Sequence, residues 1–498
     1  MGRITSYFGL RDATPEVVRL TKIYTSLGLF MQVAFTISTT FYLIFVANAL
    51  GGGGPTGYIV GMTYVGILVI IEMATQTLFD YPTGVIGDWI GQRYILLTAY
   101  LTYAITYYLV SLVTPNPPFL LLVLIYALMG FAGSQQSGAM GSWFDTNWQV
   151  AMPEDEGRKE YGVLQGKLGM LYWLTNTLVL IPGGILASIF GRPWVFQIQA
   201  VMCVAIAFLC LRYVKNLPDT DELNQKRPTM DEYFSLLREG IQFLFSSSYV
   251  KYLLIGTMLV NSCISVWSNL ILFPMYYSYM ISDVAVASFR TIVMLPLAFY
   301  SERSGVWAKR FEPKKWIPRF RFLQSAGAVF FWIFAIIMFV FPVPALDTPM
   351  IDYYLPGTTI LILKVPIDSI LPVTIMILVF FTVGIFFQLA GVLTGRVFVD
   401  AIPNRVRNGV YSLFPTVVLL LSMPQIAFFG WLISISIPLT LVSVGIISSI
   451  GCLMIRKGLQ QQHPLQDEWD TASAIEENLD LLEEISDDIG FDPDLESD

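Results

Sequence analysis

Two charged residues lie deep inside long apolar stretches, where a charge is costly unless it has a function or a partner. Glu72 lies eight residues before Asp80, and Arg290 lies seven residues after Asp283. At 1.5 Å per helical residue, each lies about 10–12 Å inside its apolar run. Burial disfavours a charged carboxyl group, so Glu72 could hold a proton and release it when water enters. Arg290 keeps its charge and needs an anion, a carboxylate or a water-filled cavity.

Both residues also have a structural interpretation. Glu72 could stay protonated and hydrogen-bond a neighbouring helix, and Arg290 could pair with Asp283, seven residues earlier on the same helical face. The depths of Glu72 and Arg290 differ by about 8 Å in a core of ~30 Å, so we expect no direct pair between them. Histidine, the usual switch near neutral pH, is absent from the apolar runs. Glu72 is therefore our candidate for proton coupling.

Uncharged polar side chains also recur inside the apolar runs. Asn261, Ser265 and Asn269 are spaced by four residues and share one helical face. We predict that they line a substrate cavity together with Arg290. The remaining cavity candidates come from three other runs: Gln32, Gln135, Gln136 and Gln388. The alternative for any one of them is a hydrogen bond between helices, worth about 0.6–2 kcal/mol.

The composition is that of a protein with many membrane spans. The chain has 498 residues, of which 55% are hydrophobic and only 13% charged, about half the charged share of an average soluble protein. A spanning helix needs ~20 apolar residues. Twelve runs meet this rule: 24–49, 57–81, 94–113, 119–143, 166–190, 194–214, 250–275, 284–301, 322–344, 371–395, 409–432 and 434–455. The expected fold is all-α and integral to the membrane.

A polar stretch divides these runs into two sets of six. We predict an N-terminal half at 1–214, a cytoplasmic connector at 215–249, a C-terminal half at 250–457 and an acidic cytoplasmic tail at 458–498. With both termini inside, all but three of the 29 Lys and Arg residues fall on the cytoplasmic side or at its helix ends. The loop between the eighth and ninth runs is the most basic: Arg303, Lys309, Arg310, Lys314, Lys315, Arg319 and Arg321.

A short polar stretch, 82–93, joins the second and third runs. Gly84, Gly87 and Gly91 recur there at helical spacing, so another helix can approach them closely. Asp88 and Arg93 supply two opposite charges that can exchange partners as that helix moves. This spacing resembles the signature loop of the major facilitator superfamily, between its second and third transmembrane helices.

A second stretch supports the resemblance. Asp145 and Arg158 follow the fourth run, and Asp400 and Arg407 follow the tenth, so the two halves are similar to distant repeats of each other. The resemblance implies a cavity lined by helices 1, 4, 7 and 10, and a gate at the inner side. The implied gate residues are Gly84, Gly87, Asp88, Gly91, Arg93, Asp145 and Arg158. We expect Asp88 to meet helix 11 when this gate is closed, and Arg93, Asp145 and Arg158 to lie close together.

Several function classes are disfavoured. The four cysteines lie within apolar runs and are expected to be buried thiols, and His463, the only histidine, lies beyond the last run. There is no metal cluster, nucleotide-binding loop or intramembrane histidine in the sequence, so we predict no catalytic residue, no metal, no cofactor and no nucleic-acid partner. Pro182, Gly183 and Gly184 are a fragment of the helix 5 motif of drug antiporters in the same superfamily.

The charge of the chain is concentrated at its C-terminus. From Asp467 onward there are 14 acidic residues and no basic one, which leaves 23 acids against 29 bases in the remainder. The tail carries apolar residues three or four apart, as in an amphipathic helix. It could dock on the basic 8–9 loop or on a basic partner, or remain solvated.

The sequence therefore predicts a secondary transporter of the plasma membrane. It would move a small polar or amphipathic solute by alternating access, as an antiporter or another secondary transporter, and act as a monomer surrounded by membrane lipid. The alternative is a lipid-handling protein or an assembly factor. A central aqueous cavity would favour transport, whereas a lateral groove near the midplane would favour lipid handling.

Overall fold

The computed structural model describes residues 7–8, 14–54, 57–155, 159–218, 220, 238, 241–243, 245–345, 347–354, 357, 361–402 and 404–461. Most of the 215–249 connector and the whole acidic tail from Asp467 lie outside these residues. The N-terminal half consists of α2 (Pro15–Thr36), α3 (Tyr42–Leu50), α4 (Gly57–Ile90), α5 (Gln92–Ser111), α6 (Phe119–Gln136), α7 (Ala139–Ala151), α8 (Lys159–Phe190) and α9 (Arg192–Tyr213).

The C-terminal half has the same alternation of long helices. It consists of α12 (Ser248–Val266), the π-helical turn η1 (Trp267–Ile271), α13 (Leu272–Met280), α14 (Asp283–Ala308), α15 (Pro313–Leu323), α16 (Ala328–Val340), α17 (Ile370–Ala401), α18 (Asn404–Ile435) and α19 (Ile437–Leu459). Ten helical segments of the described chain are long and apolar enough to cross a membrane. The first spanning segment (α2 with α3) and α14 complete the twelve that the sequence predicts.

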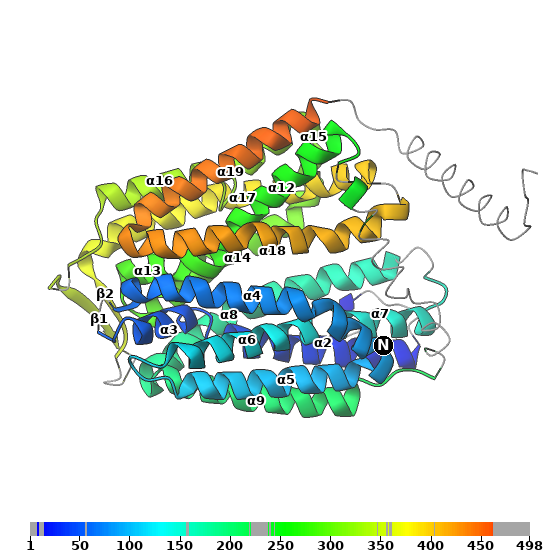
Figure 1. The fold of residues 1–498 in the computed structure, drawn as a ribbon, viewed down its shortest axis with the longest axis horizontal. Coiled ribbons are helices and arrows are strands. Elements are labelled where there is room, and N and C mark those ends of the chain that lie inside the picture. Colours follow the sequence, from blue (N-terminus) through cyan, green and yellow to red (C-terminus); the bar gives the residue numbers. More distant parts are fainter. Residues whose placement is uncertain are drawn as a thin grey trace, which may run out of the picture.

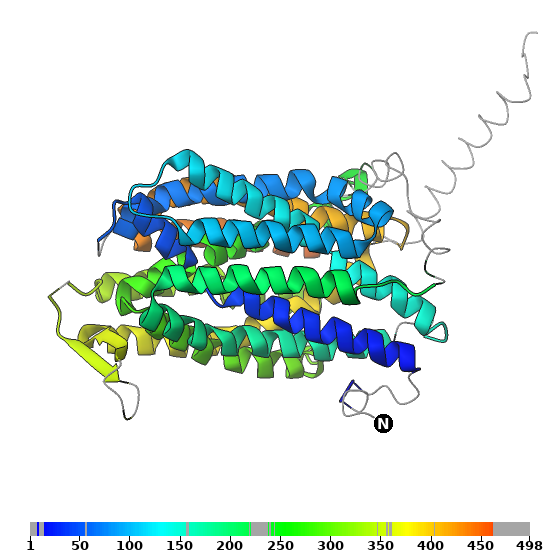
Figure 2. The same cartoon turned by 90° about the horizontal axis from the view of Figure 1, so that it is seen from below.

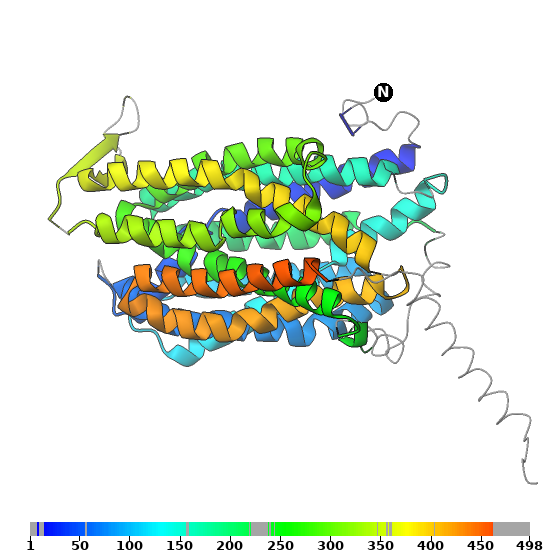
Figure 3. The same ribbon diagram turned by 90° about the horizontal axis from the view of Figure 1, so that it is seen from above.

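All the long helices run roughly along one axis, with the N-terminal half on one side and the C-terminal half on the other (Figure 1). One end of the bundle carries a two-stranded hairpin of β1 (Met350–Tyr354) and β2 (Leu361–Pro366), in which Asp352 pairs with Lys364. We call this the hairpin end. The opposite end holds the 82–93 stretch and the last residues of α19, and we call it the motif end. The separation of the two ends is equally clear in the perpendicular views (Figures 2 and 3).

The first and fourth spanning segments are broken, although the sequence predicts continuous helices there. The first is interrupted between Thr36 and Tyr42, and the fourth at Ser137 and Gly138. In the first break, the Thr39 hydroxyl donates a hydrogen bond to the Phe35 carbonyl oxygen, which illustrates how hydroxyl side chains compete with the helical ladder. In the second, Gly138 adopts a left-handed conformation with φ 72°. A hydropathy count is insensitive to both effects.

The 82–93 stretch is helical almost throughout, so the prediction of a polar turn at that place needs correction. α4 continues to Ile90, and a single residue, Gly91, connects it to α5. Gly91 has φ 97° and ψ 139°, a conformation open essentially to glycine alone. Gly191 makes the same one-residue turn between α8 and α9, with φ 87° and ψ 152°. Helices 2–3 and 5–6 therefore turn alike at opposite ends, as in an inverted repeat.

The ninth spanning segment is also divided, and this changes the picture of the basic 8–9 loop. α15 ends before Gln324 and α16 begins at Ala328. Ala326 between them has φ 54°. Lys314, Lys315, Arg319 and Arg321, predicted as loop residues, therefore lie on α15. Arg321 is buried and donates a hydrogen bond to the Thr394 hydroxyl of α17 at 3.0 Å.

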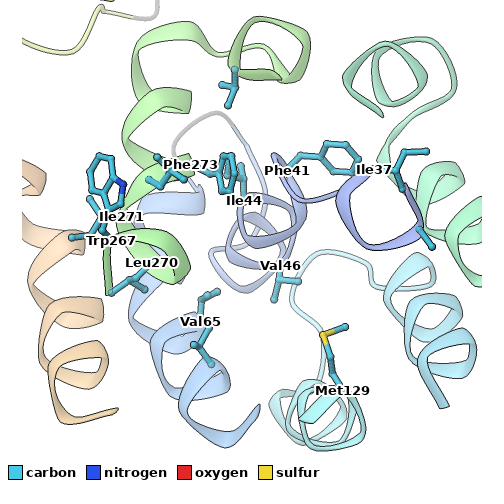
Figure 4. Close-up of a cluster of buried hydrophobic side chains, with 14 of the residues drawn as sticks. Ile37, Phe41, Ile44, Val46, Val65, Met129, Trp267, Leu270, Ile271 and Phe273 are labelled. Atoms are coloured by element: carbon cyan, nitrogen blue, oxygen red, sulfur yellow. The ribbon is translucent and has the colours of Figure 1, made fainter. Parts of the chain in front are cut away.

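One apolar cluster joins the two halves from the hairpin end to the middle of the bundle. Figure 4 shows Phe273 of α13 extending toward Ile44 of α3, so side chains of both halves pack together there. A second cluster at the motif end contains residues of the C-terminal half alone, among them Ile317 and Phe320 of α15. The four cysteines are buried free thiols, as predicted.

Candidate functional site: a central cavity between the halves

A cavity of about 370 Å³ lies between the two halves near the middle of the bundle. Its walls come from the break between α2 and α3, from α4, α5 and α6, and from the distorted part of helix 7 and α18. Polar and apolar side chains alternate along them: Phe35, Ser38, Thr39, Tyr42, Leu43, Val69, Glu72, Met73, Gln76, Tyr107, Met129, Ser265, Ser268, Asn269, Phe273 and Leu419. Such a mixed lining suits a ligand with both polar and apolar parts.

Two of the predicted cavity residues, Ser265 and Asn269, line it, together with the proton-coupling candidate Glu72. The other candidates do not. Gln135 is buried between helices and accepts a hydrogen bond from the Thr98 hydroxyl at 2.7 Å, which is the structural alternative considered for it. The remaining predicted residues lie outside the lining: Gln32, Gln136, Asn261, Arg290 and Gln388. The implied set of lining helices also changes, because helices 2, 3 and 11 contribute and helix 10 does not.

Glu72 faces the cavity from α4 without a cationic partner. No Lys or Arg forms an ion pair with it in the part of the chain that the structure describes. Tyr42, Tyr103, Tyr107 and Tyr126 lie near enough to interact electrostatically with its carboxyl group. A carboxyl group held among phenol rings, next to a cavity and away from fixed positive charge, is suited to exchange a proton.

The backbone behind Glu72 is fixed by a close helix contact. A Cβ atom at Gly130 of α6 would lie 2.2 Å from the Glu72 carbonyl oxygen, so only glycine permits this approach. Helix 4 therefore fixes the position of Glu72 through this backbone contact. Its glutamines, Gln135 and Gln136, do not line the cavity.

The opposite wall is formed where helix 7 is distorted. Asn269 lies in the π-helical turn η1 and donates hydrogen bonds to the carbonyl and hydroxyl oxygens of Ser265, at 3.0 and 3.2 Å. Single π turns commonly occur at functional sites, because the extra residue re-aims side chains. Asn261 lies four residues before Ser265 on the regular helix α12, about 6 Å nearer the motif end, and does not line the cavity.

Arg290 does not pair with Asp283, and that alternative is wrong. Asp283 is engaged by Arg192 of α9 through two hydrogen bonds, Nε and Nη2 to its two oxygens, each 2.8 Å. Among the described residues, the Nη1 atom of Arg290 is buried without a hydrogen-bond partner. The guanidinium carbon of Arg290 lies 5.9 Å from the centre of the Phe380 ring.

The Arg192–Asp283 pair joins the two halves at the hairpin end, and the sequence analysis missed it. The guanidinium of Arg192 also lies 5.2 Å from the Tyr277 ring centre, and Tyr277 meets Tyr58 of α4 edge to face at 5.3 Å. Residues of the two halves thus alternate in one cluster. The sequence could have indicated this pair, because Arg192 and Asp283 each lie at the start of a helix at the same end of the bundle.

Two helix crossings strengthen this junction. A Cβ atom at Gly66 of α4 would lie 3.2 Å from the Cα atom of Gly430 of α18. Between α8 and α14, the Thr291 hydroxyl donates to the Thr177 carbonyl oxygen at 2.9 Å. Gly184 of α8 also packs against the backbone of Asp283. The halves are therefore in tight contact from the hairpin end to the cavity.

The comparisons with known proteins now assign the family. Residues 24–346, well over half of the chain, match the family model described as Major Facilitator Superfamily. The chain belongs to the Major Facilitator Superfamily. Membership makes it a secondary transporter integral to the membrane rather than an enzyme. No curated protein matches the sequence.

Several solved structures of this superfamily share the fold. The nucleoside transporter NupG has 12% sequence identity and a TM-score of 0.61, covering 90% of this chain and 100% of its own. The D-xylose-proton symporter has 13% identity and a TM-score of 0.58, covering 90% and 98%. A bacterial homologue of the human lysosomal transporter Spinster, in an inward-facing and unoccupied conformation, has 12% identity and a TM-score of 0.58, covering 91% and 97%. At these identities the likeness shows the fold.

At the motif end, the superfamily loop is not covered by another helix in this conformation. Among the described residues, a Cβ atom at Gly84 or Gly91 would meet nothing within 4 Å, whereas one at Gly87 would meet only side chains at the start of α5. Gly162 and Gly166, on the same end of α8, are equally free of neighbours. Toward the hairpin end, by contrast, Gly66 and Gly184 are in close contact with the backbone of the other half.

At the motif end, the expected contact between Arg93 and Asp145 is not found among the described residues. Arg93 donates to the Tyr94 hydroxyl at 2.8 Å and makes no ion pair with Asp145 there. Asp145 accepts a hydrogen bond from Gln149 at 2.9 Å. Arg158 and the side chain of Asp88 lie outside the residues that the structure describes.

A different acid, Asp155, organises the loop between α7 and α8. Its two oxygens accept hydrogen bonds from the backbone N–H groups of Glu160 at 3.2 Å and Tyr161 at 3.0 Å, and from the Trp148 indole at 3.3 Å. An acid that caps the first turn of a helix could have been recognised from its place just before α8.

Proposed function

We propose that this superfamily member moves a small polar or amphipathic solute by alternating access through the central cavity. The observation that carries the proposal is a cavity between the halves with Glu72, a carboxyl group without an ion-pair partner among the described residues, on one wall and Asn269 on the other. A central cavity of this kind supports transport over an assembly role. The nucleoside transporter and xylose symporter that share the fold make nucleosides and sugars the first solutes to screen.

We further propose that both termini are cytoplasmic and that the protein resides in the cell membrane as a monomer. The Lys and Arg bias supports this orientation. The motif end would then face the cytoplasm, and the joined hairpin end would face outward. The tight contacts at Gly66 and Asp283, together with the uncovered Gly84, support a conformation that is closed outside and accessible from inside.

Proton coupling would use Glu72. In the outward-accessible state the carboxyl group would take a proton together with the solute, or exchange one for the other, and in the inward-accessible state it would release it. The absence of a described cationic partner supports this role, because a fixed cation would hold Glu72 ionised in both states. Arg290, whose Nη1 atom is buried without a hydrogen-bond partner among the described residues, lies outside the lining of this cavity, so we assign it no contact with the solute.

The test is Glu72→Gln in proteoliposomes, with a solute first identified by thermal shift against metabolite and drug panels. Glutamine mimics the protonated form, so accumulation driven by a pH gradient should be abolished while solute exchange is partly retained. Glu16→Gln, an exposed acid at the start of α2, is the control. Unchanged pH-driven accumulation in Glu72→Gln would refute proton coupling through this residue. The sign of the internal pH change on adding solute would distinguish symport from antiport.

A further inference from the structure

A second and larger cavity, of about 570 Å³, lies at the motif end between α15, α16 and α19, away from the central cavity. We call it the basic groove. It is lined by residues of a single half: Lys314, Lys315, Pro318, Arg319, Phe322, Trp332, Ser449, Cys452, Leu453, Arg456 and Gln460. Nothing in the transport mechanism uses it.

The lining of the basic groove changes in character along its length. On α15, Lys314, Lys315 and Arg319 lie toward the motif end, and Phe322 lies one turn deeper in the bundle. On α19, Arg456 lies toward the motif end and Leu453 lies deeper. Both walls thus place cations at the end of the spanning region and apolar side chains inside it.

The four cations are available to a ligand. In the part of the chain that the structure describes, none of them forms an ion pair with a carboxylate. Lys314, Lys315, Arg319 and Arg456 are all exposed. Arg319 is held by stacking over Trp316, with 5.2 Å from its guanidinium carbon to the ring centre.

The basic groove opens toward the side of the bundle that faces lipid. Ile446, Ile450 and Leu453 recur along one face of α19 and are 51%, 49% and 63% exposed. On a membrane-spanning helix, such a stripe of exposed aliphatic side chains contacts acyl chains. Leu453 belongs both to this stripe and to the groove, so a lipid chain lying on α19 leads directly into it.

We propose that the basic groove binds a membrane phospholipid with an anionic headgroup, its phosphate against Lys315, Arg319 and Arg456 and an acyl chain along Phe322 and Leu453. A basic site between helices at a membrane surface is suited to such headgroups. The competing occupant is the acidic tail that follows Gln461. The groove is continuous with the exposed aliphatic face of α19, which acyl chains cover in a membrane, so the tail would have to displace lipid to enter it, whereas an acyl chain already lies beside its apolar depth. The apolar depth therefore favours lipid.

The test is native mass spectrometry of the delipidated full-length protein, titrated with phosphatidylglycerol or with phosphatidylcholine of the same acyl chains. Wild-type protein should bind phosphatidylglycerol more tightly. Lys315→Gln/Arg456→Gln should lower that affinity about 30-fold, from ~1 kcal/mol per basic residue. Lys309→Gln/Arg310→Gln removes two exposed cations that do not line the groove and should change the affinity less than about 3-fold. Equal losses in the two variants would overturn the site.

Two further variants test shape and occupant. Ser449→Trp fills the groove without changing its charge, so it should also lower the affinity for phosphatidylglycerol; an unaltered affinity would mean that the lipid binds elsewhere. Deleting residues 467–498 should leave the affinity unchanged. A rise of tenfold or more on deletion would show that the tail occupies the groove in the full chain, which would overturn the proposal.

Discussion

In the alternating-access mechanism that we propose, the ion pair between Arg192 and Asp283 should control the balance between the outward-open and inward-open conformations. It links the halves at the hairpin end through two hydrogen bonds of 2.8 Å, and opening that end would separate its partners. We therefore expect Asp283→Asn or Arg192→Gln to shift the protein toward the conformation that is open at the hairpin end. Asparagine keeps the shape of the aspartate side chain and remains tolerable at the start of α14.

The magnitude follows from the burial of the pair. Breaking a fully buried pair by removing one partner costs about 3–5 kcal/mol, and an exposed pair contributes about 0–1 kcal/mol. The side chains of Arg192 and Asp283 are 17% and 11% exposed, so the pair lies between these limits. We expect about 2 kcal/mol, which corresponds to a shift of ~30-fold in the ratio of the two conformations.

The assay is alkylation of a cysteine placed in the central cavity, Ser268→Cys, by a membrane-impermeant maleimide added at the hairpin side. The four native cysteines are buried and should react slowly. The rate should rise in Asp283→Asn and should not rise in Lys364→Gln, which breaks an exposed pair with Asp352 at the same end. The double variant Arg192→Gln/Asp283→Asn should react more slowly than either single variant, because it leaves no unpaired charge. An unaltered rate in both single variants would refute this reasoning.

Two packing predictions concern other contacts. Gly183→Ala would place a Cβ atom 1.9 Å from the Ile37 carbonyl oxygen at the break in helix 1. It should therefore destabilise the protein by about 1–3 kcal/mol, measured by thermal unfolding. The control is Gly162→Ala, which should not lower the stability because no described atom lies within 4 Å of the added Cβ atom. Asp155→Ala removes the acceptor for the first N–H groups of α8 and should lower the stability by about 1–2 kcal/mol; an unchanged melting temperature would contradict the capping role.

The spanning helices could be predicted from the sequence because the bilayer imposes one dominant requirement, a run of ~20 apolar residues. The same requirement made Glu72 conspicuous in the sequence, and the structure places it on the cavity wall. Charge within an apolar run is a local property, so no knowledge of the tertiary structure was needed to find it.

The helix breaks and the π turn could not be predicted from the apolar runs. The Thr36–Tyr42 interruption and the Ser137–Gly138 interruption depend on local hydrogen bonding and on one left-handed glycine, which leave the apolar count unchanged. The π turn that contains Asn269 is likewise a property of the backbone, and the regular spacing did not reveal that Asn261, earlier on α12, lies outside the cavity lining. These irregular segments surround the cavity, as irregular backbone in membrane proteins does when it lines a polar space.

The sequence also did not predict contacts between residues that lie far apart in the chain. Same-helix spacing suggested Asp283 as the partner of Arg290, yet Arg192, 91 residues away in the chain, holds it. These charges meet because α8 packs against α14 and the turn at Gly191 places Arg192, at the start of α9, beside Asp283. Gln135, predicted to line the cavity, is outside the lining for a related reason. Its face of α6 turns toward Thr98 of α5 rather than toward the other half.

The continuity of α4 connects the cavity to the superfamily loop. This helix crosses α18 at Gly66, presents Glu72 to the cavity and reaches the motif end without a break, although it contains Pro82. From Gly66, Glu72 is about 9 Å away along the axis and Gly84 about 27 Å away. Rocking by ~10° about the crossing would move Gly84 by about 5 Å, roughly half of the 8–10 Å between packed helices, but Glu72 by only about 1.6 Å. A rigid α4 would therefore close or open the motif end while keeping the carboxyl group at the site, which a helix broken near Glu72 would not do.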